Sequence, residues 1–212
     1  MRSFIAVCAV AGFAGAASSQ IMVFTDRGAW ESAVGGNFVL EDFNSTAVQT
    51  IADGQTLDTG LLQIFRDGSG NGADGALAIS PGSQFGNIDG TTHLDGETGA
   101  SPHESVVFGF NGSDVYAFGA DFASPFSGDG VDLVAGGQRF SLDVIPDFDV
   151  GFFGIVNLSG SSLGSVSIAG TLEDNTFQEL WQADNIAYSV VPSPATAALL
   201  GLGGLFAVRR KR

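Results

Sequence analysis

Short runs in which apolar and polar residues alternate fill most of the chain between residues 38 and 190. A period of two is typical of strands that bury one face of a sheet. The residues between the runs are mostly Gly, Asp, Ser and Asn, which turns favour. The expected strands are Phe38–Phe43, Leu61–Phe65, Ala76–Ile79, Ser105–Phe110, Val115–Phe122, Val131–Ala135, Gln138–Leu142, Gly151–Val156, Leu163–Ile168 and Ile186–Val190.

About ten short strands with no long helix between them favour antiparallel sheets, since parallel strands need long crossover connections. Two such sheets each bury one face when they pack together. We therefore predict an all-β fold, an antiparallel two-sheet β-sandwich of jelly-roll-like form. Within Val115–Phe122, alternation places Tyr116, Phe118, Ala120 and Phe122 on the buried face.

One short helix is expected before the strands. Arg27–Val34 carries Trp30 and Val34 at helical spacing, and Asp26 precedes it as a suitable N-cap. The pair Gly35–Gly36 gives a suitable stop. We predict two helical turns at the N-terminal side of the sandwich.

The N-terminal residues have the form of a secretory signal. In Met1–Ser19, Arg2 precedes the apolar run Phe4–Ala14, and small residues follow. The alternative is a permanent anchor, although the run is too short to span a bilayer. We predict a signal at 1–19, a β-sandwich domain at 20–190 and a separate C-terminal segment at 191–212.

The C-terminal segment has three parts. Its first six residues are Val191, Pro192, Ser193, Pro194, Ala195 and Thr196. An apolar, Gly-containing run to Val208 and the cations Arg209, Arg210, Lys211 and Arg212 follow. The uncharged run Ala195–Val208 is shorter than the roughly 20 residues that span a bilayer, but snorkelling cations extend such a helix. We expect a membrane anchor with its basic flank in the cytoplasm; the alternative is a buried core helix.

This order resembles the PEP-CTERM sorting signal of Gram-negative bacteria, whose usual start is Val-Pro-Glu-Pro-Ala-Thr. Ser193 replaces the Glu of that motif. The resemblance implies processing by exosortase, a membrane protease-transpeptidase. Such tails are also called ice-binding-protein C-terminal domains, a label that concerns the anchor and implies no ice binding.

Charge narrows the classes of partner. All 23 acidic residues but only three of the eight basic residues lie between residues 20 and 190, so this region has a formal charge of −20. Nucleic-acid binding needs cationic patches and is therefore not expected. The only cysteine, Cys8, lies in the predicted signal, so we expect no disulfide in the mature domain.

Two Gly-, Asp- and Ser-rich stretches, Asp67–Gly75 and Pro81–Pro102, are expected to be surface loops. In the first, Asp67, Asn71 and Asp74 place side-chain oxygens around glycines, a spacing that suits a calcium loop. The twelfth position does not carry the Glu of an EF-hand, and a plain turn is the alternative.

A second candidate calcium site joins the first and last long strands. The early Leu40–Phe43 and the late Asp184–Ile186 are similar to segments of carbohydrate-binding jelly rolls. That similarity implies neighbouring strands with a structural Ca2+ ion near Glu41 and Asp184. The alternative is that both are solvated edge residues.

Signs of catalysis are few. His93 and His103, with Ser101, Asp95 and Glu97 nearby, allow a hydrolytic cluster to be drawn. Neither a Gly-x-Ser-x-Gly elbow nor a His-Glu-x-x-His helix lies beside them in the sequence. We predict no catalytic residues.

Trp30 and Trp181 are candidate sugar-stacking residues, but core packing is the stronger expectation for both. The leading expectation is thus an exported, non-enzymatic surface or matrix protein that associates with an exosortase-like protease, the membrane and extracellular polysaccharide. The alternatives are a calcium-stabilised carbohydrate-binding module and a secreted hydrolase.

Overall fold

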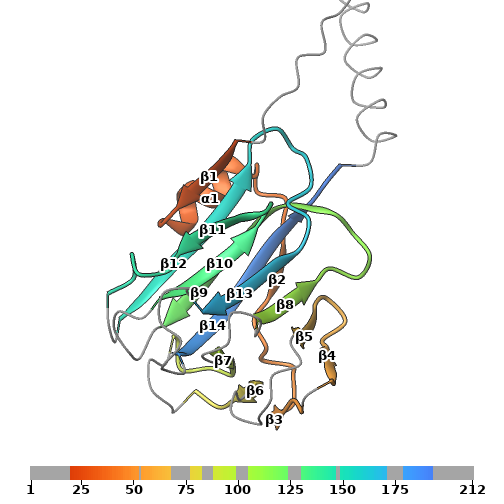
Figure 1. Ribbon diagram of the computed structural model, residues 1–212, viewed down its shortest axis with the longest axis vertical. Helices are drawn as coiled ribbons and strands as arrows, with labels where there is room; N and C mark the ends of the chain where they lie inside the picture. The colour runs from red at the N-terminus through yellow and green to blue at the C-terminus, as the bar shows by residue number, and fades with distance from the viewer. Residues whose placement is uncertain are drawn as a thin grey trace, which may run out of the picture.

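Two antiparallel sheets pack against each other in the computed structural model (Figure 1). The structure describes residues 20–52, 54–67, 77–82, 88–98, 105–123, 130–146, 149–170 and 179–192. The all-β, two-sheet sandwich predicted from the sequence is confirmed. The predicted signal at 1–19 and the C-terminal hydrophobic helix lie outside the described residues. Of the helices in the described ranges, none is both long and apolar enough to cross a membrane.

The first sheet, which we call sheet A, has eight strands. In spatial order they are β1 (Ile21–Phe24), β12 (Val150–Asn157), β9 (Val115–Ala123), β14 (Glu179–Val190), β7 (His93–Thr98), β6 (Leu77–Ser80) and β3 (Gln49–Thr50), with β2 (Val39–Glu41) also paired to β14. The twelve-residue β14 pairs with β9 from Gln182 to Val190, with β7 over its first half and with β2 over its second. It is therefore a central strand of the sheet.

The second sheet, sheet B, has six strands. Their order is β11 (Gln138–Ser141), β10 (Val131–Ala135), β13 (Val166–Gly170), β8 (Ser105–Gly109), β5 (Gln63–Asp67) and β4 (Thr56–Asp58). The expected strands Val131–Ala135 and Gln138–Leu142 become β10 and β11, which pair from Asp132 with Ser141 to Ala135 with Gln138. Strand β13 begins at Val166, later than the predicted Leu163. Gly164 has a φ of 70°, which is not a strand conformation, so the strand can start only after it.

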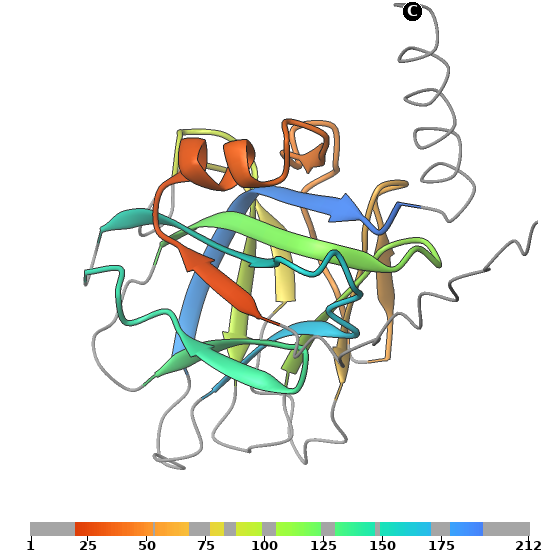
Figure 2. The ribbon, with the colours of Figure 1, turned by 90° about the horizontal axis from the view of Figure 1, so that it is seen from above.

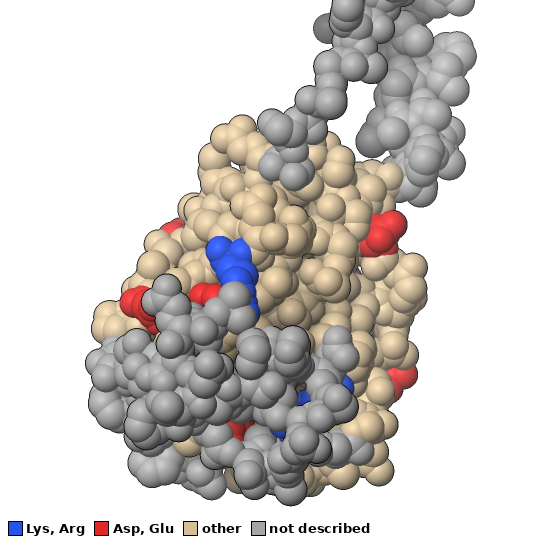
Figure 3. Space-filling view, viewed as in Figure 1, with Lys and Arg blue, Asp and Glu red and all other residues tan. Residues whose placement is uncertain are grey.

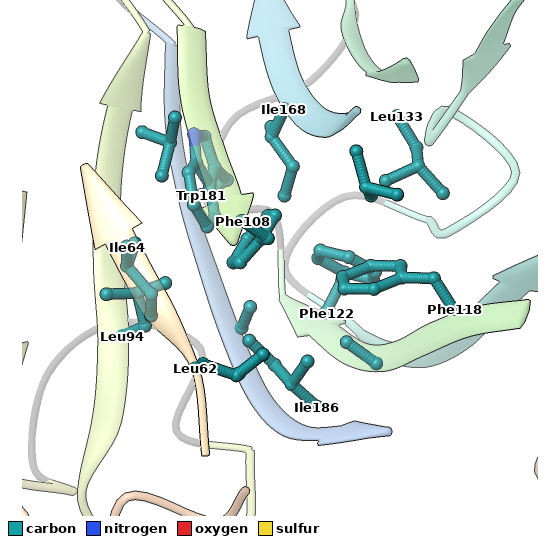
Figure 4. Packing of buried hydrophobic residues seen from close by; sticks show 14 of the residues in the cluster. Leu62, Ile64, Leu94, Phe108, Phe118, Phe122, Leu133, Ile168, Trp181 and Ile186 are labelled. Atoms are coloured by element: carbon teal, nitrogen blue, oxygen red, sulfur yellow. The ribbon is translucent and has the colours of Figure 1, made fainter. Parts of the chain in front are cut away.

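Large aromatic and aliphatic side chains fill the space between the sheets. Figure 4 shows Phe118 and Phe122 of sheet A facing Leu133 and Ile168 of sheet B, with Phe108 beside them. Trp181 also lies here and is 2% exposed, so the expectation of core packing is confirmed for it.

Tyr116 departs from the prediction that it shares this face. It packs instead against the smaller apolar cluster on the outer face of sheet A, while Val115 takes the inward position. The cause is a register shift: Ala117 pairs with Ser189 but Val115 pairs with Val190, so β9 holds one extra residue.

Strand β7 lies inside Pro81–Pro102, which the sequence predicts to be a loop, and this prediction is wrong. The apolar period is hidden because Gly96 occupies an inward position. A Cβ at Gly96 would lie 2.1 Å from Cζ2 of Trp181, so the indole takes the place of the missing side chain. Only Leu94 is left to mark the buried face.

The predicted helix is present as α1 (Arg27–Ala33), and Figure 2 shows it lying on the outer face of sheet A. The Oδ1 of Asp26 accepts a hydrogen bond from the N–H of Ala29 at 2.7 Å, which makes it the N-cap. Trp30 is fully buried, donates its Nε1–H to the carbonyl of Ile155 at 3.2 Å and stands over Gly154. Core packing is thus confirmed for Trp30 as well.

Candidate polar site on the outer face of sheet A

A group of polar side chains covers the outer face of sheet A beside the apolar cluster of α1. Trp181 and Ala183 of β14 point into the core, so Gln182 and Asp184 point outward. We call the hydrogen-bonded group around them the outer-face network. It consists of Arg27, Asp89, Thr91, His93, Asp95, Asp121, Gln182, Asp184 and Asn185.

A bulge in β14 shapes the centre of this network. Asp184 pairs with Asp121 and Ala187 with Gly119, so β14 carries one extra residue between these positions. Asn185 has a φ of 50°, a left-handed conformation that Asn tolerates better than most residues. Its Nδ2 lies 3.1 Å from Oδ2 of Asp121 and 3.4 Å from Oδ2 of Asp89. The bulge therefore turns an amide toward two carboxylates.

Arg27 ties the helix to the bulge. Its NH2 group lies 3.0 Å from Oδ2 of Asp121 and donates to the carbonyl of Asn185 at 2.8 Å. The guanidinium carbon stands 4.7 Å from the ring centroid of Phe152. Arg27 thus compensates one of the four carboxylates of the network while its planar group packs on an aromatic face.

His93 is the buried base of the network. It is 0% exposed, and its Nε2 lies 3.2 Å from Oδ1 of Asp95 while its Nδ1 lies 3.3 Å from the carbonyl oxygen of Thr91. The hydrogen bond to Asp95 is the main reason that the pKa of His93 is raised above 6.5, against the opposing effect of burial. Burial alone would raise the pKa of Asp95, but hydrogen bonds from His93, Ser80 and Gln182 lower it below 3.8.

Asp184 is the buried acid of the network. It is 0% exposed, and burial, with a smaller contribution from the charge of Asp89, raises its pKa from 3.8 to about 7. Its Oδ1 accepts from the N–H of Asn185 at 2.7 Å, and its Oδ2 lies 3.2 Å from Oγ1 of Thr91. The single hydroxyl proton of Thr91 is engaged with Asp89, whose pKa that hydrogen bond lowers. The Thr91 hydroxyl also lies within donor distance of Oδ2 of Asp184, and that contact lowers the pKa of Asp184 against the larger effect of burial.

The structure pairs β2 with β14, as expected for the segments that carry Glu41 and Asp184, but the two carboxylates lie on opposite faces of sheet A. Glu41 is opposite Ile186, which points into the core, and its Oε1 accepts from the N–H of Phe43 at 2.9 Å. In a regular strand Asp184 and Ile186 would share a face; the bulge at Asn185 separates them. Glu41 and Asp184 therefore do not converge on one ion.

The other predicted site residues fall partly outside the described ranges. Asp67 ends β5, whereas Asn71 and Asp74 lie outside the described residues, as do Ser101 and His103. Where the structure describes the chain, no three His, Cys, Asp or Glu side chains are grouped so that they could hold a metal ion. Of the hydrolytic cluster drawn from the sequence, the structure brings together His93 and Asp95.

Sequence reasoning missed the partners that link this network, namely Arg27, Asp89, Thr91 and Asp121. They come from a helix, a segment between strands and a separate strand, so no spacing along the chain connects them. The one sequence signal was Asp184-Asn185 before the last apolar run, two residues with low strand propensity inside what is now β14.

The acidic excess does not gather into a patch on the face shown in Figure 3, where described Asp and Glu side chains are scattered among uncharged residues. No family model matches the sequence, and no curated protein matches it. Any role for the outer-face network must therefore be argued from its geometry alone.

Proposed function

We propose that this chain is an exported protein, held at the cell surface or in the extracellular matrix, that acts without catalysis through adhesion or association with exopolysaccharide. The observation that carries the proposal is the C-terminal motif beginning Val191-Pro192-Ser193-Pro194. The sandwich ends where that motif begins, since β14 ends at Val190 and the N–H of Val191 donates to the carbonyl of Asp114 at 2.8 Å. An exosortase-type protease would then meet a segment that directly follows a folded domain.

The jelly-roll-like organisation is part of the same proposal. From β7 to β14, successive strands alternate between the two sheets except at the β10–β11 hairpin. Repeated crossing from sheet to sheet is the arrangement of jelly rolls, which occur in many lectin and capsid domains. This organisation supports a binding or structural role.

A non-enzymatic role is supported by the geometry of His93. A general base needs a free ring nitrogen within reach of substrate. Both nitrogens of His93 face protein acceptors, and the residue is fully buried. The hydrolase alternative, which rested on His93 and His103, therefore gains no support from His93.

The sorting part is tested by replacing Pro192 and Pro194 with Ala in the native host. We expect the variant chain to keep its tail and to lose its normal surface location, read from immunoblot mobility and cell fractionation. A Pro81→Ala chain is the matched control, because that exposed proline lies in the domain. Normal processing of the Pro192/Pro194 variant would overturn the proposal.

The binding part includes the calcium-stabilised carbohydrate module as its second form. The pairing of β2 with β14 is the strand arrangement that the similarity to carbohydrate-binding jelly rolls implies, although Glu41 and Asp184 do not share an ion. Calcium would then be held by the Asp67–Asp74 loop. The purified chain is sedimented with the host's exopolysaccharide, in calcium and in chelator. Retention only in calcium supports the module, retention in both supports calcium-independent association, and retention in neither contradicts polysaccharide binding.

A further inference from the structure

We propose that His93 is a buried imidazolium clamp that helps to fasten residues 88–92 to sheet A, and that loss of its proton as pH rises loosens this segment. The proposal concerns the conformation of the outer face and does not depend on how the chain is sorted. It rests on which atoms surround the ring.

The two partners of the ring are both acceptors. The carbonyl oxygen of Thr91 has no hydrogen to donate, so Nδ1 of His93 must be the donor of that bond. The pKa of Asp95 is lowered, so its carboxylate is ionised and can only accept; Nε2 of His93 must therefore donate to Oδ1, which also accepts from Nε2 of Gln182 at 2.8 Å. A neutral imidazole has one N–H group, whereas both bonds together need two.

Burial makes the alternative unfavourable. In the neutral ring one nitrogen lone pair would face an oxygen at 3.2 or 3.3 Å. Since the residue is 0% exposed, water cannot take the place of the lost partner. The folded arrangement therefore binds the proton more tightly than an unfolded chain does.

The surrounding charges act in the same direction. Described charged groups come from the segment before the ring, from β7, β14 and β9 and from α1, and they are Asp89, Asp95, Asp184, Asp121 and Arg27. Four are acidic, and the one cation, Arg27, is paired with Asp121. Asp95 and Asp184 both raise the pKa of His93 through their charges.

The clamp acts on the segment through Thr91. The backbone N–H and the hydroxyl of Thr91 donate to Oδ1 of Asp89 within the segment. The carbonyl oxygen of Thr91 accepts from the protonated Nδ1 of His93, which lies in β7. The segment has two further contacts with β14: Oγ1 of Thr91 lies 3.2 Å from Oδ2 of Asp184, and Oδ2 of Asp89 accepts from Nδ2 of Asn185 at 3.4 Å. The bond from His93 to Thr91 therefore weakens as pH rises, and the stabilisation by His93 is present below pH 6.5 and lost above its raised pKa.

The test is an NMR titration of the ring signals in the purified full-length chain, which has two histidines. A His93→Gln variant identifies the signal of His93, and His103→Gln is the matched control. We expect His93 to titrate above 6.5 and to be a doubly protonated ring at pH 6. A His93 signal that titrates at or below 6.5, or that shows a single tautomer at pH 6, would overturn the proposal.

Loosening of the segment is read by amide hydrogen exchange, expressed as protection factors to remove the intrinsic effect of pH. We expect the protection of Thr91 and His93 to fall at least several-fold between pH 6 and pH 9, while amides of β13 keep theirs. Equal protection at both values contradicts the loosening.

If His93→Gln does not fold, Asp95→Asn serves instead. It keeps the shape and an acceptor oxygen but removes the charge, so the titration of His93 should move to lower pH. The exposed Asp143→Asn is its control and should leave the titration in place. An unchanged titration in Asp95→Asn would contradict the proposed pairing.

Discussion

Replacing Asp184 by Asn should stabilise the protein at alkaline pH and leave its stability at acid pH nearly unchanged. The side chain of Asn is neutral at all relevant pH values, can accept from the N–H of Asn185 and can donate to Oγ1 of Thr91. It therefore reproduces the contacts of protonated Asp184, which lie at 2.7 and 3.2 Å. What it removes is the need to bury a charge above the pKa.

The magnitude follows from the pKa of Asp184, which burial raises from 3.8 to about 7. The folded state binds this proton more tightly than the unfolded state, so stability falls as pH rises from about 4 to about 7 and then levels off. The pKa of Asp184 differs by about 3 between the folded and unfolded states, and each unit corresponds to about 1.36 kcal/mol. The loss of folding free energy at high pH is therefore at most about 4 kcal/mol. Partial relaxation around the charge leaves an expected gain of about 2–4 kcal/mol at pH 8.

The assay is urea unfolding of both proteins between pH 4 and pH 8, with a chelator present so that no cation neutralises the carboxylate. Asp143→Asn is the matched control, since an exposed aspartate should change stability by no more than about 0.5 kcal/mol. A constant difference between Asp184→Asn and the parent at every pH would refute the reasoning. A variant that is less stable at pH 8 would refute it more directly.

Two substitutions test the packing of sheet A. Gly96→Ala should lower the free energy of unfolding by about 1–3 kcal/mol or more, because its Cβ would lie 2.1 Å from the buried Trp181 ring. Urea unfolding measures this loss, and Gly28→Ala in α1 is the control that should not destabilise the protein. Trp30→Ala should cost about 3–5 kcal/mol and release α1 from the sheet; a loss below about 1 kcal/mol in the same assay would contradict the anchoring role of Trp30.

The sequence was a good guide wherever one face of a strand carries large apolar side chains. The helix was predictable for the same kind of reason, since Asp26 and Trp30 are local signals that act within α1. Strand β7 was missed because Gly96 points into the core without a side chain, and the space beside it is filled by the indole of Trp181 from another strand. A pattern along one segment cannot show a side chain that another segment supplies.

The outer-face network was predictable only in fragments, and the reason lies in β14. The sequence analysis predicted that Asp184 lies next to Glu41, and the structure does pair β14 with β2. One extra residue at Asn185 then turned Asp184 to the opposite face, where Asp121 and Thr91 meet it. Bulges shift the period without a clear sequence mark, and the partners they create are therefore found only in three dimensions.

The central position of β14 has a mechanical consequence. If the tail holds the chain to a surface, any pull on the domain enters at Val191, directly after the last residue of β14. That strand is flanked by β9 on one side, from Gln182 to Val190, and by β7 and β2 on the other. Tension would load these ladders along the strand direction, so many hydrogen bonds must break together. An edge strand pulled sideways would instead open one bond at a time, so a tether attached after β14 would meet more resistance than one attached to an edge strand.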